Sequence, residues 1–510
     1  MVSIPVTVKH GPTSHALMLD TTQPPLGFKG LISDVTGVPV DRMKVMLRGK
    51  VVKDESSWDE FKPKAGQTFM VLGSATELPK GPSKPVVFLE DMNDTQLAGA
   101  LRMPVGLVNM GNTCYMNATL QLLRSVPELQ IALGSYNGAP SLTSALRDLY
   151  KGMSETADAV PPLIFLTLLR QANPQFAEQS RSGGGYAQQD ADECWQQIVT
   201  SLNTLPGIKP VPKGDVDMDG ASSSAPTAHF LEQYMMGQMS KTMTCDAAPE
   251  EPSTHTIERI FKLDCNISIN TNFMLSGILD SLDQKITKNS PSLGREAVYT
   301  EKSRVSRLPE YLTVHMVRFY WRRDISKKAK IMRKVKFPFD FDATELATPE
   351  LAKRLQPIQG RIREIEKERD ERRKVRRKTK DSADGSVKKE EAEKEHAVRK
   401  EEKEELEKLV DTDLQTDIGA SLTGLYELVA LVTHKGASAD SGHYIGWVRK
   451  DAVNRPTNGS VDDLEAERDV WYKFDDDKVS TVDKDKITQL EGGGEDSTAY
   501  ILLYKTKRLD

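Results

Sequence analysis

Cysteine is scarce in this chain, with four in 510 residues, and no two of them form a C-x-x-C pair. So few cysteines exclude a disulfide-stapled fold, and the missing pairs argue against zinc ribbons and thioredoxin-type motifs. We therefore expect a reducing compartment, the cytoplasm or the nucleus. No run of about 18 apolar residues occurs, so we expect no membrane span. We also expect no signal peptide, since no charged region precedes an apolar run at the N-terminus.

Hydrophobic residues are also few, at 38% of the chain against roughly 45–50% in a typical globular protein. This deficit predicts that part of the chain lies outside any core, although the length suffices for two or three domains. The formal net charge is only -5, from 69 Lys and Arg against 74 Asp and Glu. That balance argues against nucleic acid as a partner, because nucleic-acid-binding domains tend to be strongly basic.

Three segments lack the residues that build a core. Residues 76–103 contain prolines that cannot sit inside a helix or a central strand, so we predict a linker. Residues 206–227 are rich in Pro, Gly and Ser, which predicts a disordered loop. Residues 361–408 hold 18 basic and 16 acidic side chains, so 34 of 48 are charged. We predict that this charged insert is solvated and lies outside the core.

The two parts of the charged insert differ in sign, which leaves alternatives open. Residues 361–380 are mostly basic and residues 390–407 mostly acidic, so a helical hairpin paired by charge is possible. The basic run 372–378 also fits an RNA-binding segment or a nuclear signal. A solvated insert remains the favoured interpretation.

Residues 1–75 form a predicted α+β unit. Alternating apolar and polar residues over 2–8 predict a half-buried strand at its start. A helical stretch covers residues 26–36 and ends at a glycine with a proline beyond it. Apolar segments at 45–47 and 68–72 complete the predicted sheet.

The order of these elements, and the segment 37–50 in particular, resembles ubiquitin. The chain runs on through residues 72–75 without a diglycine tail, which indicates a fixed ubiquitin-like domain and not a modifier. Aligned on the turn 48–50, Met46 falls at the isoleucine of ubiquitin's binding patch and Val71 near the patch valine. The resemblance therefore implies that Met46 and Val71 bind a partner. The alternative is that Met46 only caps a small core.

The most informative stretch is residues 106–123. After Asn112 the apolar residues recur at helical spacing, so Asn112 or Thr113 is the predicted N-cap. Cys114 then lies in the first turn, where exposed backbone N–H groups and the helix dipole favour a thiolate. A nucleophilic cysteine needs such a setting, although the same pattern also fits an inert buried cysteine.

A general base has to come from elsewhere in the chain. His443 follows a glycine-containing loop and precedes an apolar strand at 444–448, and catalytic side chains are commonly held at such positions. Residues 475–477 are three consecutive aspartates that follow another apolar segment. A carboxylate there could orient the imidazole of His443. Three aspartates in a row also fit a solvated turn.

Together these segments resemble the ubiquitin-specific proteases, a family of papain-like cysteine enzymes, over residues 104–506. The matching motifs are the Cys114 stretch, residues 188–193, residues 308–312, Ser-Gly-His-Tyr at 441–444, Phe-Asp-Asp at 474–476 and the closing strand 499–504. The resemblance implies an α+β fold in which an N-terminal β-grasp ubiquitin-like domain precedes a papain-like catalytic domain of fingers, palm and thumb. We place the domains at 1–75 and 104–510. With its ubiquitin-like domain, the chain resembles the proteasome-associated members of that family.

The resemblance also implies a role for each matching residue of the catalytic centre. Cys114 would be the nucleophile and His443 the general base and acid. Asp475 would orient His443, with Asp476 as the alternative. Asn109 would donate its side-chain amide to the oxyanion.

Further residues match the family at the substrate groove. Asp190 and Glu193 would hold the extended, arginine-containing tail of ubiquitin, because carboxylates one helical turn apart suit that ligand. A solvated helix face is the alternative for these two. Tyr444 would line the narrow channel that admits only glycines. His434 ends the preceding strand and is not expected to be the base.

Many family members bind zinc in the fingers through two C-x-x-C pairs. Only Cys245 and Cys265 lie in the corresponding region here, which is too few for a tetrahedral site. We therefore expect no structural zinc and no cofactor.

The implied activity is hydrolysis of isopeptide bonds after the C-terminal glycine of ubiquitin, on conjugates at the 26S proteasome regulatory particle. The implied location is the cytoplasm and the nucleus. The alternative is a scaffold that binds ubiquitin and the proteasome without cleaving. Segments 319–332 and 435–440 flank the groove in this family and are polar or basic loops with little to pin them. We therefore expect weak activity alone and higher activity with the proteasome.

Overall fold

A computed structural model describes residues 3–73, 103–180, 184–208, 228–322, 327–379, 385–437, 441–453, 467–494 and 496–507. The chain divides into two compact units, Met1–Asp91 and Met92–Asp510. Apart from Met103, the predicted linker 76–103 lies outside the described residues, as does the predicted loop beyond residue 208. Among the described helices, none has the length and apolar character needed to cross a membrane.

The first unit is a five-stranded sheet packed against one main helix. The strand order is β2-β1-β5-β3-β4, and β1 and β5 run parallel at the centre. A proline begins α1 and Gly37, at φ 69°, ends it. This is the β-grasp arrangement, which confirms the predicted fold of the unit. Its elements are β1 (Ser3–His10), β2 (Thr13–Asp20), α1 (Pro25–Thr36), η1 (Val40–Arg42), β3 (Lys44–Leu47), β4 (Lys50–Val52), α2 (Trp58–Phe61) and β5 (Thr68–Leu72).

The register of this sheet corrects one predicted partner-binding residue. Val71 is 2% exposed and pairs with Val45, and both side chains belong to the core of the unit. Because side chains alternate along a strand, Met70 points the other way, is 55% exposed and lies opposite Met46. The prediction for Val71 is therefore wrong. Met46 is partly exposed and shares its face of the sheet with Met70.

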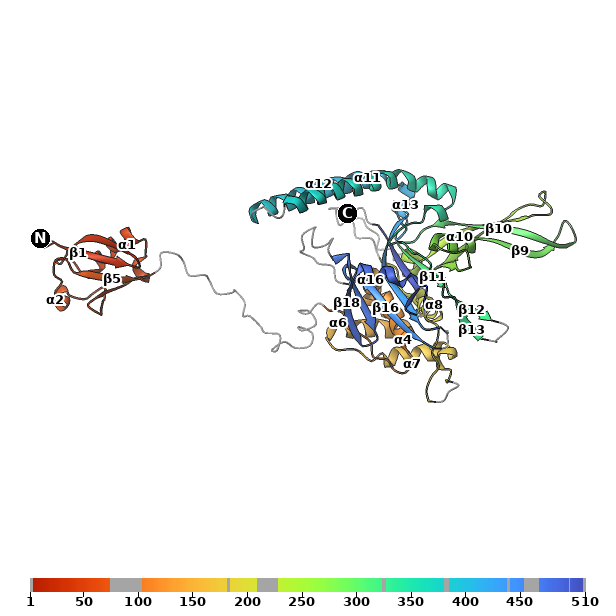
Figure 1. Ribbon diagram of the computed structural model, residues 1–510, viewed down its shortest axis with the longest axis horizontal. Helices are drawn as coiled ribbons and strands as arrows, with labels where there is room; N and C mark the ends of the chain where they lie inside the picture. Colours follow the sequence, from red (N-terminus) through yellow and green to blue (C-terminus); the bar gives the residue numbers. More distant parts are fainter. Residues whose placement is uncertain are drawn as a thin grey trace, which may run out of the picture. The chain divides into compact units, whose positions relative to one another are not determined.

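The second unit is built around an eight-stranded sheet with the order β18-β17-β16-β15-β19-β11-β8, to which β14 adds by pairing with β15 (Figure 1). The central strand β15 is buried along almost its whole length between β16 and β19, which explains its nearly continuous apolar sequence. The strands are β8 (Leu263–Asn266), β11 (Tyr311–Val317), β14 (Asp340–Asp342), β15 (Leu425–Lys435), β16 (His443–Arg449), β17 (Val470–Asp475), β18 (Lys478–Asp483) and β19 (Thr498–Thr506).

A group of helices covers one face of this sheet. Helix α4 packs directly on β15, β16 and β17, and α5 and α8 pack on α4. The helices and short 3-10 turns are α4 (Cys114–Arg124), α5 (Pro127–Ser135), α6 (Leu142–Glu155), α7 (Leu163–Ala172), η3 (Pro174–Ala177), α8 (Ala191–Ser201), η4 (Leu202–Thr204), α9 (Phe230–Tyr234), α10 (Met274–Leu282), η5 (Thr344–Leu346), α13 (Thr412–Thr416), α14 (Lys450–Val453), α16 (Lys484–Thr488) and η6 (Gln489–Glu491).

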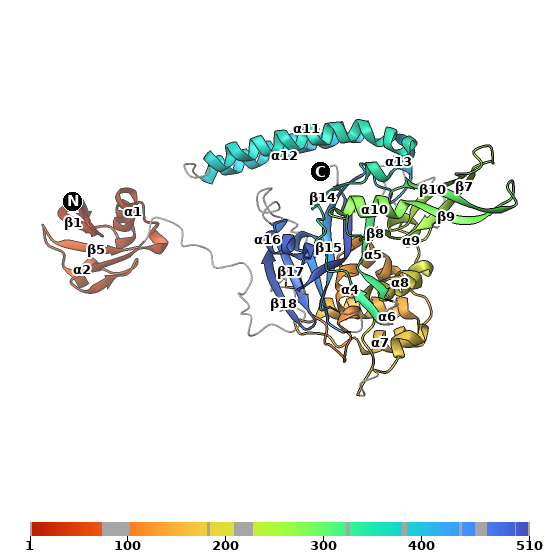
Figure 2. The ribbon, with the colours of Figure 1, turned by 45° about the vertical axis from the view of Figure 1, so that its right-hand side comes forward.

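A second, four-stranded sheet has the order β7-β6-β10-β9 and extends from the body of the unit (Figures 1 and 2). Near its far end Glu251 accepts hydrogen bonds from Ser290 (2.7 Å), Ser292 (2.6 Å) and Tyr299 (2.6 Å). The described residues contain no group of three or more side chains that could hold a metal ion. The strands are β6 (Gly237–Cys245), β7 (Thr254–Ile260), β9 (Asp283–Ser290) and β10 (Arg295–Arg307).

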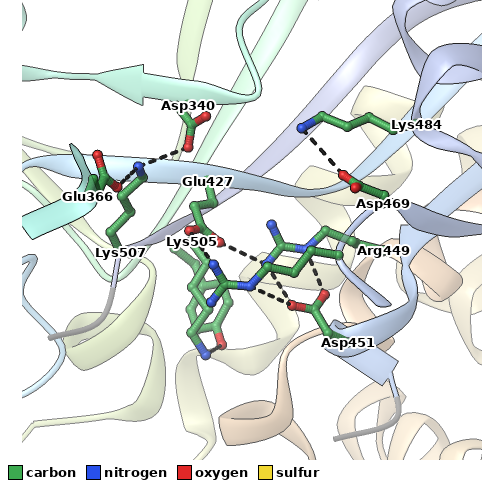
Figure 3. Close-up of polar contacts among 11 residues, drawn as sticks. Asp340, Glu366, Glu427, Arg449, Asp451, Asp469, Lys484, Lys505 and Lys507 are labelled. Atoms are coloured by element: carbon green, nitrogen blue, oxygen red, sulfur yellow. Dashed lines mark hydrogen bonds and ion pairs between the residues drawn. The ribbon is translucent and has the colours of Figure 1, made fainter. Parts of the chain in front are cut away.

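The charged insert forms a helical hairpin, which we call the arm. It consists of α11 (Pro349–Thr379) and α12 (Gly385–Leu409), which run side by side (Figures 1 and 2). At its root, Ile362, Ile365 and Leu406 are buried in the core that also contains the sheet. The prediction that the insert lies outside the core is therefore wrong for the root, where apolar side chains recur at helical spacing. Lys507 adds an ion pair to Glu366 there, at 2.5 Å (Figure 3).

Beyond the root, the two helices of the arm are joined by ion pairs. Arg369 contacts Glu402 at 2.7 Å, and Arg372 contacts Glu402 at 2.7 Å and Glu395 at 3.1 Å. Glu395 and Glu402 are each 5% exposed. The hairpin paired by charge, one of the alternatives from the sequence, is thus the observed arrangement. Arg372 belongs to the basic run considered for RNA binding, and its guanidinium already has carboxylate partners.

Candidate active site

The candidate nucleophile, Cys114, is the first residue of helix α4. Thr113 is the N-cap residue, and its hydroxyl accepts a hydrogen bond from the backbone N–H of Met110 at 2.9 Å. Asn112, at φ 54°, turns the chain into the helix. The structure therefore places the sulfur at the positive end of the helix dipole, in a side chain that is 2% exposed.

His443 lies between Cys114 and Asp475. It is the first residue of β16, and Asp475 is the last residue of the antiparallel neighbour β17, so the sheet brings both to one edge. His443 Nε2 is 2.6 Å from Asp475 Oδ1. A hydrogen bond with Cys114, opposed by burial and aided by Asp475, raises the pKa of His443 to about 9. Because Asp475 occupies Nε2, Nδ1 is the nitrogen left for Cys114.

Asp475 also accepts a second charged hydrogen bond. Lys473 Nζ lies 2.8 Å from Asp475 Oδ2, on the same strand. Burial raises the pKa of Asp475, but the hydrogen bonds from Lys473 and His443 outweigh it and hold this pKa below its ordinary value. The carboxylate stays ionised, which is the form that stabilises an imidazolium. Sequence reasoning missed Lys473, although its place two residues before the aspartate on a strand puts it on the same face.

Asp476 serves a different purpose from its neighbour. At φ 54° it turns away from the strand, and its carboxylate accepts hydrogen bonds from Asn109 and Asn117, each at 2.8 Å. The side-chain oxygen of Asn109 accepts from the backbone N–H groups of Gly111 and Thr113 at 2.9 and 3.2 Å. The amide of Asn109 is thus fixed in orientation, with one of its two hydrogens directed to Asp476. These contacts favour Asp475 over Asp476 as the partner of the histidine.

His434, the other histidine near the sheet edge, is fully buried. Burial, together with the charge of Lys330, lowers the pKa of His434 to about 3, so the ring is neutral. It packs against the rings of Phe319 at 5.2 Å and Tyr444 at 4.7 Å between centroids. The ring of His434 therefore packs in the core and is not part of the series of contacts that joins Cys114, His443 and Asp475.

The backbone just before His443 requires glycine. Gly442 has φ 120°, and a Cβ there would lie 2.2 Å from the carbonyl oxygen of Lys435 and 2.7 Å from Nε2 of His434. Glycine has no Cβ and adopts this conformation without steric cost. The close approach brings the loop directly against β15 and sets where His443 enters β16.

A pocket of about 190 Å³ lies beside helix α8, and it is lined by Asp190, Asp192, Glu193, His315, Val317, Phe319, Tyr320 and Tyr500. Asp190 is the N-cap of α8 and accepts from the Tyr500 hydroxyl at 2.7 Å. Glu193 accepts from Gln175. Both predicted tail-binding carboxylates therefore face one pocket, which we call the tail pocket.

Tyr444 is not part of that lining. It is 1% exposed and packs against the rings of His434 and Tyr500, so in this arrangement it lies behind the wall of the tail pocket. The wall itself includes Phe319 and Tyr320, which belong to a hairpin of β12 (Phe319–Arg322) and β13 (Lys327–Lys330). This hairpin belongs to the predicted covering segment 319–332, of which residues 323–326 lie outside the described part of the chain. Residues 438–440 of the other covering segment lie outside the described residues.

Comparison with known proteins settles the family. The model of the family "Ubiquitin carboxyl-terminal hydrolase" matches residues 105–504. The chain belongs to the ubiquitin carboxyl-terminal hydrolases. The hydrolase named 6 of Schizosaccharomyces pombe is 39% identical, over 99% of each chain. The one named 7 of Arabidopsis thaliana is 36% identical, over 96% of each, and the one named 14 of Caenorhabditis elegans is 28% identical, over 98% of this chain and 93% of that one.

Membership in the ubiquitin carboxyl-terminal hydrolases makes this chain a thiol-dependent ubiquitin hydrolase. Its catalytic unit has the α+β architecture expected for the family, and the relatives match it through the N-terminal ubiquitin-like unit as well. The pairing of Cys114 with His443 and Asp475 is the geometry that a thiol hydrolase needs.

The hydrolase keeps the strands of its site in register with an ion cluster at their other ends. Arg449, the last residue of β16, lies 2.9 Å from Glu427 and 2.6 Å from Asp451 (Figure 3). The carboxylates of Asp451 and Glu427 outweigh burial and raise the pKa of Arg449. His443 lies at the opposite end of β16, so the cluster holds the strand that presents the histidine against β15.

Proposed function

We propose that the protein hydrolyses isopeptide bonds after the C-terminal glycine of ubiquitin, with Cys114 as nucleophile and His443 as general base and acid. The observation that carries this is the position of His443, which is 2.6 Å from Asp475 and whose pKa is raised mainly by its interaction with Cys114. Asp475 would keep the imidazole in the required tautomer and stabilise its protonated form. This alignment supports hydrolysis over a scaffold that binds without cleaving.

The reaction would run in two steps. The Cys114 thiolate attacks the glycine carbonyl, and the imidazolium of His443 gives its proton to the leaving lysine amine as the C–N bond breaks. Water then attacks the thioester while His443 takes a proton from it, and the glycine carboxylate leaves Cys114. Asn109 has one amide hydrogen bound to Asp476, so its other hydrogen is free to donate to the oxyanion.

The tail pocket would bind the cationic C-terminal tail of ubiquitin. Asp190 and Glu193 line it, and the aromatic rings of Phe319 and Tyr320 form a wall beside them. Carboxylates and aromatic faces are the groups that hold guanidinium side chains. Tyr444 is buried behind this wall, and it would reach the tail through local adjustment of the rings of His434 and Tyr500 while the hairpin β12–β13 stays in place.

We further propose that the protein acts at the proteasome through its ubiquitin-like unit, in the cytoplasm and the nucleus. Met46 and Met70 form an apolar pair on one face of that sheet, and Met70 is 55% exposed. Met46→Glu and Met70→Glu should each weaken binding to purified 26S proteasome at least tenfold and leave the activity of the free enzyme unchanged. Met18→Glu, at an equally exposed methionine on β2, is the matched control. Unweakened binding would reject this surface.

The decisive experiment is reaction with a ubiquitin C-terminal electrophile, with and without proteasome, followed by mapping of the modified residue. We expect modification of Cys114, slow in the free protein and much faster with proteasome, because the hairpin would cover part of the groove until a partner binds. Modification of another cysteine would reject the assigned nucleophile. Equal rates in both conditions would reject the covering role of the hairpin and leave the hydrolysis intact.

A further inference from the structure

The hairpin β12–β13 touches both the tail pocket and the strand that pairs with the base. Phe319 and Lys330 are direct cross-strand partners within it. Phe319 lines the pocket, whereas Lys330 reaches the end of β15. There, Lys330 Nζ donates to the carbonyl oxygen of His434 at 2.7 Å and to that of Gly436 at 3.1 Å.

These two carbonyls lie on either side of the residue opposite the base. His434 and Gly436 flank Lys435, and Lys435 pairs with His443 in the sheet. Lys330 is therefore bonded to the backbone that carries the partner of His443. The ring of Phe319 packs edge-on against His434, which gives the hairpin a second contact with the same strand.

The ammonium group of Lys330 lies in an environment that disfavours a charge. Lys330 is 7% exposed, and in the described parts of the chain no carboxylate forms an ion pair with it. Burial, followed by the nearby charge of Arg318, lowers the pKa of Lys330 to about 8. A buried cation without a counter-ion costs stability, so packing alone would be better served by an apolar side chain of the same length.

We propose that Lys330 is a positioning residue that couples the wall of the tail pocket to the backbone of His443. A tail that contacts Phe319 and Tyr320 holds the hairpin in place. The two hydrogen bonds of Lys330 then fix the backbone at the end of β15 relative to the hairpin. Occupancy of the pocket would thus improve the alignment of His443 with Cys114. The inference rests on the proposed deubiquitinating function and adds to it a link between substrate binding and the base.

The test compares Lys330→Met with Lys334→Met, a control at a lysine that is 58% exposed and paired with Glu491. Turnover of a fluorogenic ubiquitin substrate is measured from pH 6 to 10, after titration of active sites with the ubiquitin electrophile. We expect Lys330→Met to lower kcat about tenfold with KM changed less than about threefold, because hydrogen bonds from a charged donor are lost. The alkaline limb of its pH profile should move to lower pH, since a less well held imidazole loses its partners.

A double-mutant cycle with Phe319→Leu separates coupling from damage. Phe319→Leu alone should raise KM several-fold and lower kcat, and its effect on kcat should shrink at least threefold in the Lys330→Met background. Lys330→Gln, which keeps one donor nitrogen, should have an intermediate kcat. It replaces Lys330→Met in the test if the methionine variant does not fold. A wild-type kcat and pH profile for both Lys330 variants, strictly additive effects, or an equal loss in Lys334→Met would overturn the proposal.

This outcome can be told apart from failure of the proposed function. If the electrophile does not modify Cys114 in the wild-type protein, the function fails. If it does, and the Lys330 variants behave like the wild type, only the coupling fails.

Discussion

The catalytic cleft and the arm both pair charged side chains, but His443 and Asp475 in the cleft are about one-third exposed, whereas Glu395 and Glu402 in the arm are buried. In the cleft, His443 and Asp475 come from two strand ends, and each is fixed by the surrounding fold. In the arm, Glu395 and Glu402 are paired with arginines of the facing helix, and Glu395 also with Arg399 of its own helix. The difference teaches that a partly exposed charge pair can serve chemistry in one place, while a buried pair stabilises a local structure in another. Substitutions should therefore alter activity in the cleft and stability in the arm.

The largest expected effect is that of Asp475→Asn. The amide of Asn can still accept from the imidazole but carries no negative charge to stabilise the imidazolium of His443, so kcat should fall by about 10²-fold. The protein should remain folded, as judged by thermal unfolding. Asp477→Asn, at the exposed neighbour, is the control and should retain full activity. An equal loss in both variants would show that the cleft, like the arm, responds mainly through stability.

The second effect is on the pH dependence of the cleft. The pKa of His443 is raised to about 9, mainly by Cys114, so the proton stays on the ring up to that pH. Because a raised histidine pKa means that the folded state binds the proton more tightly, its stabilisation is full below about pH 6.5 and is lost as the pH rises through about 9. We expect kcat to fall on the alkaline side near pH 9. In Asp475→Asn this fall in kcat should occur at lower pH. A fall at the same pH as in the wild type would contradict the role of Asp475.

In the arm, Glu402→Gln should cost about 2 kcal/mol of stability, because two guanidinium groups lose the charge of a buried carboxylate. Hydrogen exchange in residues 394–409 should rise, and kcat should match the wild type. Glu404→Gln, on the exposed face of the same helix, is the control. A clear loss of kcat in Glu402→Gln alone would break the distinction between the two regions.

The smallest effect is expected at the exposed side of the arm. Arg361 contacts Glu405 at 2.8 Å, but Glu405 is about half exposed, and solvent screens such pairs. Arg361→Gln should lower the unfolding midpoint less than Glu402→Gln does. The difference from wild type should vanish in about 1 M salt, where charges are screened within a few ångströms. A difference that persists in high salt would place this pair with the buried ones.

The sequence was sufficient to single out Cys114, His443 and the aspartates, which the structure brings together, because these residues stand in recognisable motifs. The sequence was insufficient to decide which of Asp475 and Asp476 contacts His443, because the answer depends on the left-handed backbone at Asp476. Lys330 gave no signal, since it is one lysine in a basic segment and its two carbonyl partners, His434 and Gly436, are distant in the sequence. These features arise from tertiary contacts, which a local pattern does not contain.

Two errors had signals that could have prevented them. Val71 was placed on the binding face by alignment, but the alternation of β5 puts Met70 there, one residue away. Ile362 and Ile365 lie within the charged insert and continue the helical spacing of Ile358 just before it, and that spacing indicated a buried root. In both cases the periodicity of the chain was a better guide than its average composition.

Gly442 has a consequence for how this hydrolase can change over generations. Any other amino acid there would place a Cβ 2.2 Å from the Lys435 carbonyl oxygen, immediately before the general base. In a random-mutagenesis library selected for turnover, that codon should keep glycine, while Gly494, whose surroundings are open, should drift freely. His443 thus follows a position that tolerates only glycine. Substitutions at that position are therefore not available as a way to change the alignment of His443 during evolution.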